Sequence, residues 1–334
     1  MLILRHDDVR RILDGRTAEL IDLVAEAYRA HHEGRSSLPH SVFLRFPEQP
    51  ADRIIGLPGY LGGERPVAGM KWIASFPGNL AAGLARASAV MVLNSPATGH
   101  PEALVEASLI SARRTAASAA LAAGLLLPDG GAGTTGVTLV GTGVINGEVL
   151  AALRVRLPDL AEVTVHDHDP ERAERFARVT ADETGLKVHR EDSLPAALAA
   201  HGLVSFATTA GEPYVDPADV PAGSTVLHVS LRDLHPETVL GSRNVVDDAD
   251  HVCRERTSLH LTEQRVGNRE FIEAEIGALL GPDAAPFVRD RAQTVVFSPF
   301  GLGVLDLALA DFVRREARRQ GLGLTVDGFL PQHD

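Results

Sequence analysis

Four charged residues of this chain stand in apolar stretches and have the side chains needed for proton transfer and carboxylate binding: Lys71, Arg86, Arg114 and Asp233. Lys71 is one of two lysines beside 30 arginines, and its neighbours in "GMKWIASFPGN" favour burial. Burial lowers the pKa of a lysine toward neutrality, whereas an arginine stays protonated. Lys71 is therefore a candidate for proton transfer.

Asp233 and the two arginines suggest complementary roles. Asp233, in "HVSLRDLHPE", follows the carboxyl end of an expected strand, where ligands bind in parallel sheets, and it can act as a general acid or base. The guanidinium groups of Arg86 and Arg114 match carboxylates in a bidentate geometry. The alternative for each residue alone, and for Arg114 in particular, is an ordinary solvated surface position.

The sequence gives no metal or disulfide signature. The histidines form no H-E-x-x-H pattern, and His166 and His168 are better explained as the rim of a ligand site than as metal ligands. The single cysteine, Cys253, cannot form an internal disulfide and is expected to be buried and inert.

The segment "VTLVGTGVINGEVL" places a strand, Gly141, Thr142, Gly143 and a helix start in immediate succession. Glycines let such a turn approach a pyrophosphate, which binds at the helix N-terminus. The expected cofactor contacts here are the turn and the first helical residues, Val144 and Ile145. The motif departs from G-x-G-x-x-G, because Asn146 takes the third glycine position.

The next strand, "EVTVHD", ends at Asp167, near the spacing at which an acidic residue binds the ribose of NAD. A carboxylate there disfavours the 2'-phosphate of NADP, although His166, His168 and Arg172 soften that preference. The remaining alternative is a glycine-rich turn in an α/β protein that binds no dinucleotide.

Two groups of predicted helices and strands must position these residues. Residues 17–34 have helical spacing, and "SVFLRFP", "RIIGLPGYL", "VAGMKWIASFP" and "ASAVMVLN" predict a mostly antiparallel sheet with a hairpin turn at "NSPATGHP". An alanine-rich helix over residues 107–127, interrupted at Gly124, precedes "PDGGAGTTG", which marks either a domain boundary or a tight helix-to-strand link.

From residue 137 onward strands and helices alternate, which predicts βαβ units and a parallel sheet. The end of the chain, "TVVFSPFGLGVLDLALADFVRREARRQG", predicts a strand or loop followed by a long amphipathic helix.

Composition narrows the class of partner. The net charge of -12, with no large Lys/Arg cluster, argues against a nucleic acid or an anionic membrane and favours a small molecule. No apolar stretch approaches the length of a membrane span, and the N-terminus lacks a signal-peptide pattern, so we expect a cytoplasmic protein.

Six motifs in order, "MKWIASFPGN", "TGHPEALVEAS", "ARRTAASAALAA", "VGTGVING", "SLRD" and "SPFGLGVLDLALA", resemble the ornithine cyclodeaminase and mu-crystallin family over nearly the whole chain. The resemblance implies a Rossmann NAD-binding domain, residues 119–304, inserted into an α+β substrate-binding and dimerisation domain, residues 1–118 plus 305–334. It also implies a homodimer in which the sheets of two subunits meet.

The resemblance assigns roles residue by residue. Lys71 matches the lysine that contacts the substrate carboxylate and reacting centre, Arg114 the carboxylate-binding arginine and Asp233 the acid/base aspartate. The implied cofactor contacts are Thr115 near the phosphates, Asp167 on the ribose and Phe300 against the nicotinamide, together with Thr208 and Ser230.

Two departures point to one branch of the family. Ornithine cyclodeaminases have an arginine where this chain has Ser41, and a threonine where it has Arg86. "FLRFP", "DRIIGLPGYLGG" and "RASA" look like the siderophore-type branch, the N-(2-amino-2-carboxyethyl)-L-glutamate dehydrogenases. That substrate has three carboxylates, which Arg86, Arg114 and Arg45 or Arg53 would neutralise.

The implied reaction transfers hydride from the glutamate α-carbon to NAD, and water then releases 2-oxoglutarate and L-2,3-diaminopropionate, with NADH formed. Ornithine cyclodeamination, ketimine reduction and amino-acid dehydrogenation remain alternatives. A further alternative is a protein that binds nucleotide and ligand without turnover, like mu-crystallin; the presence of both Lys71 and Asp233 speaks against it.

Overall fold

The computed structural model describes residues 1–331 and divides the chain into two compact units. The first unit comprises Met1–Arg114 with the segment that begins at Leu302, and the second comprises Thr115–Gly301. The family resemblance implies these boundaries after residues 118 and 304 instead. A single helix, α3 (Ser108–Leu126), runs through the first boundary, so no change of composition marks it.

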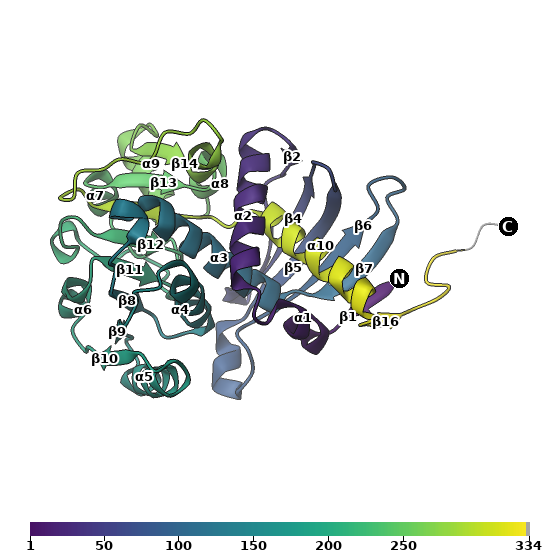
Figure 1. Cartoon of the computed structure of the whole chain (residues 1–334), viewed down its shortest axis with the longest axis horizontal. Helices are drawn as coiled ribbons and strands as arrows, with labels where there is room; N and C mark the ends of the chain where they lie inside the picture. The colour runs from purple at the N-terminus through teal and green to yellow at the C-terminus, as the bar shows by residue number, and fades with distance from the viewer. Residues whose placement is uncertain (332–334) are drawn as a thin grey trace. The chain divides into compact units, whose positions relative to one another are not determined.

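The first unit is built on a largely antiparallel sheet in the order β16-β1-β7-β6-β5-β4-β2, with β3 paired to β4 (Figure 1). Its strands are β1 (Leu2–Leu4), β2 (Ser36–Ser37), β3 (Val42–Phe46), β4 (Gln49–Leu61), β5 (Val67–Ser75), β6 (Ala87–Asn94), β7 (Pro101–Glu106) and β16 (Leu324–Thr325). Its helices are α1 (His6–Leu13), α2 (Thr17–His32), the short 3-10 helix η1 (Pro77–Ala82), the start of α3, and α10 (Gly303–Gln320).

Helices α2 and α10 lie against one face of this sheet (Figure 1). Strand β5 shows the consequence of the two-residue period: Val67, Lys71 and Ser75 are buried on the helix side, while Met70 and Trp72 are 38% exposed on the other. The helix-covered face therefore holds Lys71 in the core of the unit, and the opposite face remains apolar and open.

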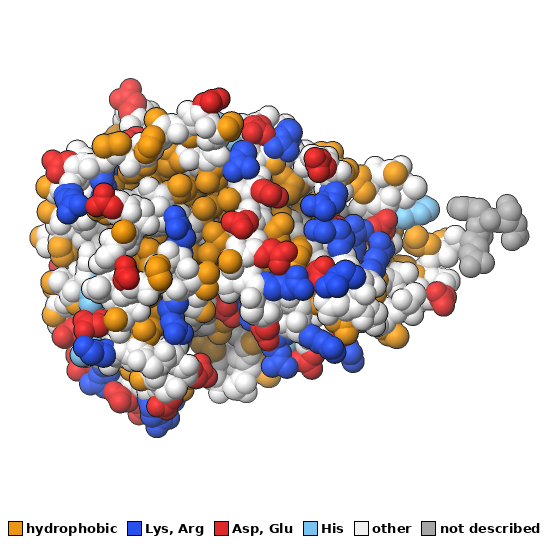
Figure 2. Space-filling model, in the orientation of Figure 1, with side chains coloured by type: hydrophobic (Ala, Val, Ile, Leu, Met, Phe, Trp, Pro, Cys, Tyr) orange, Lys and Arg blue, Asp and Glu red, His pale blue; other side chains and the backbone are white. Residues whose placement is uncertain are grey.

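The last turns of α10 carry a mixed-charge surface. Figure 2 shows blue and red side chains gathered over this helix. Arg319 pairs with Glu316 at 2.7 Å and Arg315 with Asp311 at 2.9 Å, at the three- and four-residue spacings that stabilise helices.

The second unit is a fully parallel sheet in the order β10-β9-β8-β11-β12-β15-β13-β14, as expected of a doubly wound Rossmann fold. Its strands are β8 (Gly136–Val140), β9 (Glu162–His166), β10 (Lys187–Arg190), β11 (Leu203–Phe206), β12 (Thr225–His228), β13 (Arg243–Val246), β14 (Ile272–Glu275) and β15 (Val295–Ser298). Its helices, besides most of α3, are α4 (Val144–Arg156), α5 (Pro170–Thr184), α6 (Leu194–Ala200), α7 (Pro236–Leu240), α8 (Ala249–Val252) and α9 (Ser258–Val266), with short 3-10 turns at Pro128–Gly131 (η2), Pro217–Asp219 (η3) and Ile276–Leu280 (η4).

The predicted fold class is confirmed, with one correction in α3. The helix is not interrupted at Gly124 but continues to Leu126. The glycine is required by packing instead, because a Cβ at this position would lie 2.0 Å from Nε of Arg156. Of the two interpretations of "PDGGAGTTG", the structure supports the helix-to-strand link, because the end of α3, η2 and β8 all belong to the second unit.

Within residues 1–331, no helix is both long enough and apolar enough to cross a membrane.

Candidate active site

The first unit buries an ionic cluster around Lys71. The ammonium of Lys71 donates to Asp306 Oδ2 at 2.7 Å and to the hydroxyl of Ser111 at 3.2 Å. Arg114 Nε donates to the other oxygen, Asp306 Oδ1, at 3.3 Å. The side chains of Lys71 and Asp306 are 2% and 0% exposed, so one buried carboxylate holds two cations.

Three elements bring these groups together. Lys71 lies in the middle of β5, Ser111 and Arg114 are one helical turn apart at the start of α3, and Asp306 lies in the first turn of α10. An aspartate in a first helical turn is favoured by the helix dipole. The positive end of α10 and two side-chain cations therefore all stabilise the charge of Asp306.

Burial lowers the pKa of Lys71 to about 8, with the charge of Asp306 opposing the shift and that of Arg114 adding to it. A group with this pKa exchanges protons near neutral pH, as the sequence analysis expected of a buried lysine. Lys71 is able both to bind an anionic ligand and to give up its proton.

The other predicted substrate-binding residues lie on the same face of the sheet as Lys71. Strand register pairs Arg53 with Ser75 and Arg45 with Arg53, and Arg86 donates to the Ser75 hydroxyl at 2.8 Å. Ser75 is four residues from Lys71 along β5, a distance of roughly 13 Å at the usual rise per residue. The arginines thus form a basic row near one end of the strand, at Ser75.

Arg45 and Arg53 differ in their exposure. Arg45 is exposed, and its guanidinium carbon lies 5.3 Å from the ring centroid of Phe43, whereas Arg53 is half-buried. Arg86 is also half-buried.

The second unit holds the predicted nucleotide turn. Gly141 has φ +90°, and a Cβ there would lie 2.5 Å from the carbonyl oxygen of Ala207, so only glycine fits between β8 and β11. Gly143 is the N-cap of α4, where no side chain caps the helix, and Val144 follows it 74% exposed. These features suit the binding of an anionic group at the start of α4.

The side chain of Asn146 stabilises this turn by hydrogen bonds to its backbone. Its fully buried amide donates to the carbonyls of Gly141 at 2.7 Å and Val140 at 2.9 Å, and its oxygen accepts from the hydroxyl of Ser205 at 2.8 Å. In the sequence, Asn146 is recognisable only as a departure from the glycine pattern. In the structure it connects the turn to β11.

Asp167 follows β9 at the same edge of the sheet. Its Oδ2 accepts from the backbone N–H and the hydroxyl of Thr142, at 2.8 and 2.7 Å, and Oδ1 accepts from Asp169 N at 3.0 Å. Burial acts to raise the pKa of Asp167, but these hydrogen bonds outweigh it and the pKa is lowered. A carboxylate that is ionised at neutral pH therefore lies beside the turn.

Asp233 lies in a second buried cluster of this unit. Its oxygens accept from the hydroxyls of Thr208 and Ser230, each at 2.5 Å, and of Tyr214 at 3.1 Å. His228 Nε2 lies 3.2 Å from Oδ2. Burial acts to raise the pKa of Asp233, yet hydrogen bonds from His228, Ser230 and Thr208 lower it overall.

The remaining predicted cofactor residues come from several segments of the second unit. Thr115 is half-buried in α3, and Phe300 follows β15, where its backbone N–H donates to the buried carboxylate of Asp247 at 2.8 Å. Thr208 and Ser230 bind Asp233, as described above.

The sequence alone did not predict roles for four residues of these clusters: Asp306, Ser111, Tyr214 and His228. Asp306 had a detectable signal, because it is a lone acid in the apolar run "GLGVLDLALA". The roles of Ser111, Tyr214 and His228 depend on contacts between distant segments, which spacing alone does not encode.

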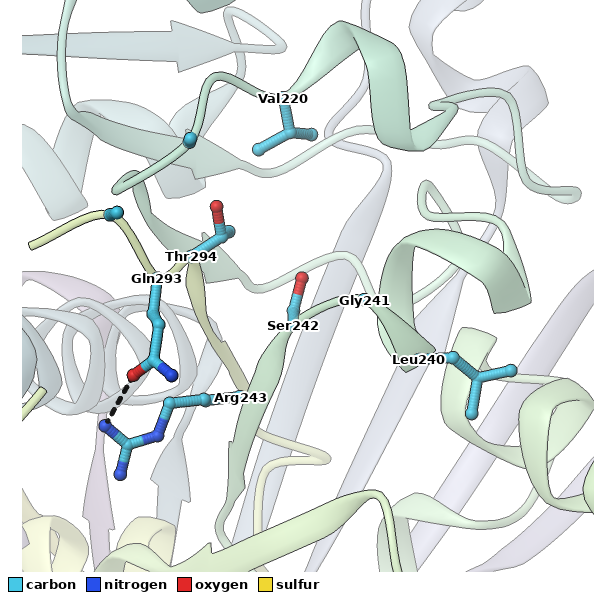
Figure 3. Close-up of a pocket in the computed structure, with 9 residues that line it drawn as sticks. Val220, Leu240, Gly241, Ser242, Arg243, Gln293 and Thr294 are labelled. Atoms are coloured by element: carbon cyan, nitrogen blue, oxygen red, sulfur yellow. Dashed lines mark hydrogen bonds between the residues drawn. The ribbon is translucent and has the colours of Figure 1, made fainter. Parts of the chain in front are cut away.

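Among residues 1–331, no group of three or more His, Cys, Asp or Glu side chains could hold a metal ion. A hollow of about 430 Å³ lies elsewhere in the second unit, near the amino ends of β13 and β15 (Figure 3). Arg243 at its wall donates to Gln293 Oε1 at 3.4 Å (Figure 3). Arg243 also pairs with Glu273. The hollow contains none of the predicted site residues.

A family model and a characterised relative both match this chain over nearly its whole length. The model of the ornithine cyclodeaminase/mu-crystallin family matches residues 3–321. The N-((2S)-2-amino-2-carboxyethyl)-L-glutamate dehydrogenase of Staphylococcus aureus is 30% identical over 98% of both chains.

Two solved structures are similar over nearly their whole length. The Delta(1)-pyrroline-2-carboxylate reductase of Thermococcus litoralis, in complex with NADH and L-proline, has a TM-score of 0.90 at 25% identity and covers 98% of this chain and 100% of its own. CmnK has a TM-score of 0.90 at 33% identity, with 99% of both chains covered.

We predict that Asp306→Asn lowers the free energy of unfolding at pH 7 by about 3 kcal/mol, because it leaves Lys71 and Arg114 buried without their shared carboxylate. It also removes the charge that raises the pKa of Lys71, so this pKa falls below about 8. Because the variant's Lys71 releases its proton earlier, the loss of stability shrinks as the pH rises toward 8. Urea denaturation across this pH range measures both effects.

The matched control is Asp22→Asn, on the exposed side of α2 in the same unit, which should leave the free energy of unfolding unchanged. The double variant Lys71→Met/Asp306→Leu should recover part of the loss, since it removes both buried charges. Equal stability of Asp306→Asn and the unmodified protein would contradict the proposed strength of the cluster.

Proposed function

Because the chain belongs to the ornithine cyclodeaminase/mu-crystallin family, we propose that it is an NAD-dependent oxidoreductase acting on a CH–NH donor. The substrate is N-(2-amino-2-carboxyethyl)-L-glutamate, which the enzyme oxidises and hydrolyses to L-2,3-diaminopropionate and 2-oxoglutarate. We place the reaction in the cytoplasm, where it would supply diaminopropionate for siderophores or other natural products.

The basic row at Ser75 is the observation that carries the substrate assignment. Arg86, Arg53 and Arg45 share the sheet face of Lys71, and Arg114 lies beside Asp306. Several cations on one face suit a ligand with three carboxylates better than one with a single carboxylate. The S. aureus relative supports the same choice by its name.

NAD fits the turn of the second unit. The start of α4 would hold the pyrophosphate through Gly141, Thr142, Gly143, Val144 and Ile145. The ionised carboxylate of Asp167 would bind the ribose and repel a 2'-phosphate. Thr115, Thr208, Ser230 and Phe300 complete the proposed set of cofactor contacts.

The bound nicotinamide would accept the hydride of the glutamate α-carbon. Side chains of the protein bind the substrate carboxylates and transfer the protons. Arg114 and the basic row bind carboxylates, and Lys71 holds a carboxylate and polarises the carbon–nitrogen unit. Asp233 assists removal of a proton from water, which adds to the imine, and the adduct then collapses to the ketone and the free amine.

The principal alternative is reduction of a cyclic imine, the reaction named for the Thermococcus relative, whose complex contains NADH and L-proline. Ornithine cyclodeamination would produce proline without net NADH, and amino-acid dehydrogenation would act on a primary amine. A nucleotide-binding protein without turnover is the non-enzymatic alternative. The buried Lys71, with its pKa of about 8, favours catalysis over simple binding.

We expect the purified protein, NAD and synthetic N-(2-amino-2-carboxyethyl)-L-glutamate to yield NADH, 2-oxoglutarate and L-2,3-diaminopropionate in equal amounts. Absorbance measures NADH, and mass spectrometry measures the other two products. Ornithine, alanine and a pyrroline carboxylate with NADH are the comparison substrates. Turnover of one of these, with none of the tricarboxylate, would overturn the assignment.

We predict that Arg86→Gln raises KM for the tricarboxylate at least tenfold, because one charge-assisted hydrogen bond to a carboxylate contributes about 1.5–3 kcal/mol. The dissociation constant for NAD should not change. Arg318→Gln, an exposed arginine in the last turn of α10, is the matched control and should leave KM unchanged. An unaltered KM in Arg86→Gln would remove Arg86 from the substrate site.

We further propose that the open face of the first-unit sheet forms a homodimer. Val90, Trp72, Gly56 and Val42 form one row across four strands, and Val90, Trp72 and Val42 are 40%, 38% and 64% exposed. Met70 adds a further exposed apolar side chain next to this row. A contiguous apolar surface of this kind marks an association face.

Trp72→Glu should therefore shift the protein from dimer to monomer in analytical ultracentrifugation, because dimerisation would bury its charge. Val155→Glu, at an exposed apolar position on α4, is the control and should stay dimeric. A Trp72→Glu dimer as strong as that of the unmodified protein would rule out this face.

A further inference from the structure

His228 lies directly behind Asp233 and is fully buried. It is the last residue of β12, and Ser298 is the last residue of the adjacent strand β15. The Nδ1 atom of His228 lies 3.0 Å from the Ser298 hydroxyl. On its other side, Nε2 lies 3.2 Å from both the backbone nitrogen and Oδ2 of Asp233.

These contacts fit two arrangements of the ring proton. With the proton on Nδ1, the ring donates to Ser298 and Nε2 accepts the backbone N–H of Asp233. With the proton on Nε2, the ring donates to the Asp233 carboxylate, and Nδ1 accepts from the Ser298 hydroxyl, which rotates to suit either case. Both ring nitrogens therefore have a hydrogen-bond partner in either state, and a proton on Nε2 exchanges the hydrogen bond from the Asp233 backbone N–H for one to the Asp233 carboxylate.

The Asp233 carboxylate itself is poorly suited to keep a proton. Thr208 and Tyr214 donate to Oδ1, and Ser230 donates to Oδ2, so three hydroxyls occupy most of its roughly four acceptor positions. His228 occupies the remaining position at Oδ2 only when Nε2 carries a proton. The pKa of Asp233 is lowered despite burial. The neighbouring phenol cannot serve instead as a base, because burial and the charge of Asp233 raise the pKa of Tyr214.

We propose that His228 is a positioning residue that takes up, through Asp233, the proton released when water adds to the imine. The inference rests on the proposed function. The proton passes from water to an Asp233 oxygen and on to Nε2 of His228, and it returns by the same route to the amine nitrogen when the carbon–nitrogen bond breaks. No net proton stays on the pair, and Ser298 follows each change by reorienting its hydroxyl.

The groups packed against His228 determine how readily its ring takes up a proton. The ring of Phe206 meets the imidazole edge-on, with centroids 6.4 Å apart, and Ser298 is neutral. Asp233 is the charged partner that the structure places against the ring, with Tyr214 one contact further away. The His228–Asp233 contact is thus the main electrostatic determinant of the proposed proton transfer.

The test is His228→Gln, whose side-chain amide can still donate to Asp233 but cannot take up a proton. We expect kcat to fall about 100-fold, the usual contribution of acid–base assistance, while KM and the dissociation constant for NAD stay unchanged. The pH profile of kcat should also change shape, because glutamine has no ring nitrogen to take up the proton. A purely structural role would lower kcat but leave the shape of its pH profile unchanged.

The matched control is His201→Gln, a half-buried histidine of the same unit whose Nε2 lies 3.2 Å from the Thr164 hydroxyl; it should keep both kcat and its pH profile. An unchanged kcat in His228→Gln would overturn the inference. Failure of the unmodified enzyme to oxidise the tricarboxylate would instead overturn the proposed function.

A second measurement needs no substrate. NMR of isotope-labelled histidine in the NAD-bound protein should show a different distribution of the ring proton between Nδ1 and Nε2 of His228 in Asp233→Asn, since the variant removes the charge against Nε2. An identical distribution in the two proteins would overturn the inference even if no substrate were turned over.

Discussion

The contact between Lys71 and Asp306 is the constraint around which the first unit is organised. Desolvating an ammonium and a carboxylate costs several kcal/mol for each ion, so the pair is tolerable only with close geometry and further partners. The 2.7 Å contact, the Ser111 hydroxyl and Arg114 supply them. As a result β5, α3 and α10, from distant parts of the sequence, must meet at one point.

This arrangement also explains the choice of residue types. A lysine at position 71 keeps a pKa of about 8 beside Asp306, whereas an arginine would remain a fixed charge in the same place. Asp233 in the second unit differs from Lys71, because its hydrogen-bond donors outweigh the effect of burial on its pKa and keep the carboxylate ionised. The proposed chemistry thus needs two kinds of group: one whose proton is easily exchanged and one whose negative charge is kept.

Much of the fold follows from local sequence. Alternation of buried and exposed residues in "VAGMKWIAS" indicates a strand with one covered face, and the strand–turn–helix pattern at Gly141 predicts the Rossmann turn. Sequence reasoning was wrong about Gly124, because the glycine relieves a contact with Arg156, which is 32 residues away. The roles of Ser111 and His228 were missed for a similar reason, because they come from tertiary contacts while the local sequence resembles an ordinary helix or strand.

Asn146 removes the need for a ligand to order the nucleotide turn. Where glycines alone shape such a turn, the backbone is free to move until phosphate binding orders it. Here a buried amide bridges Val140, Gly141 and Ser205, so the turn is fixed when the protein folds. The conformational entropy is lost at folding rather than at binding. A cofactor would therefore meet a site already in its binding shape, and cycles of cofactor release and rebinding would leave the turn unchanged.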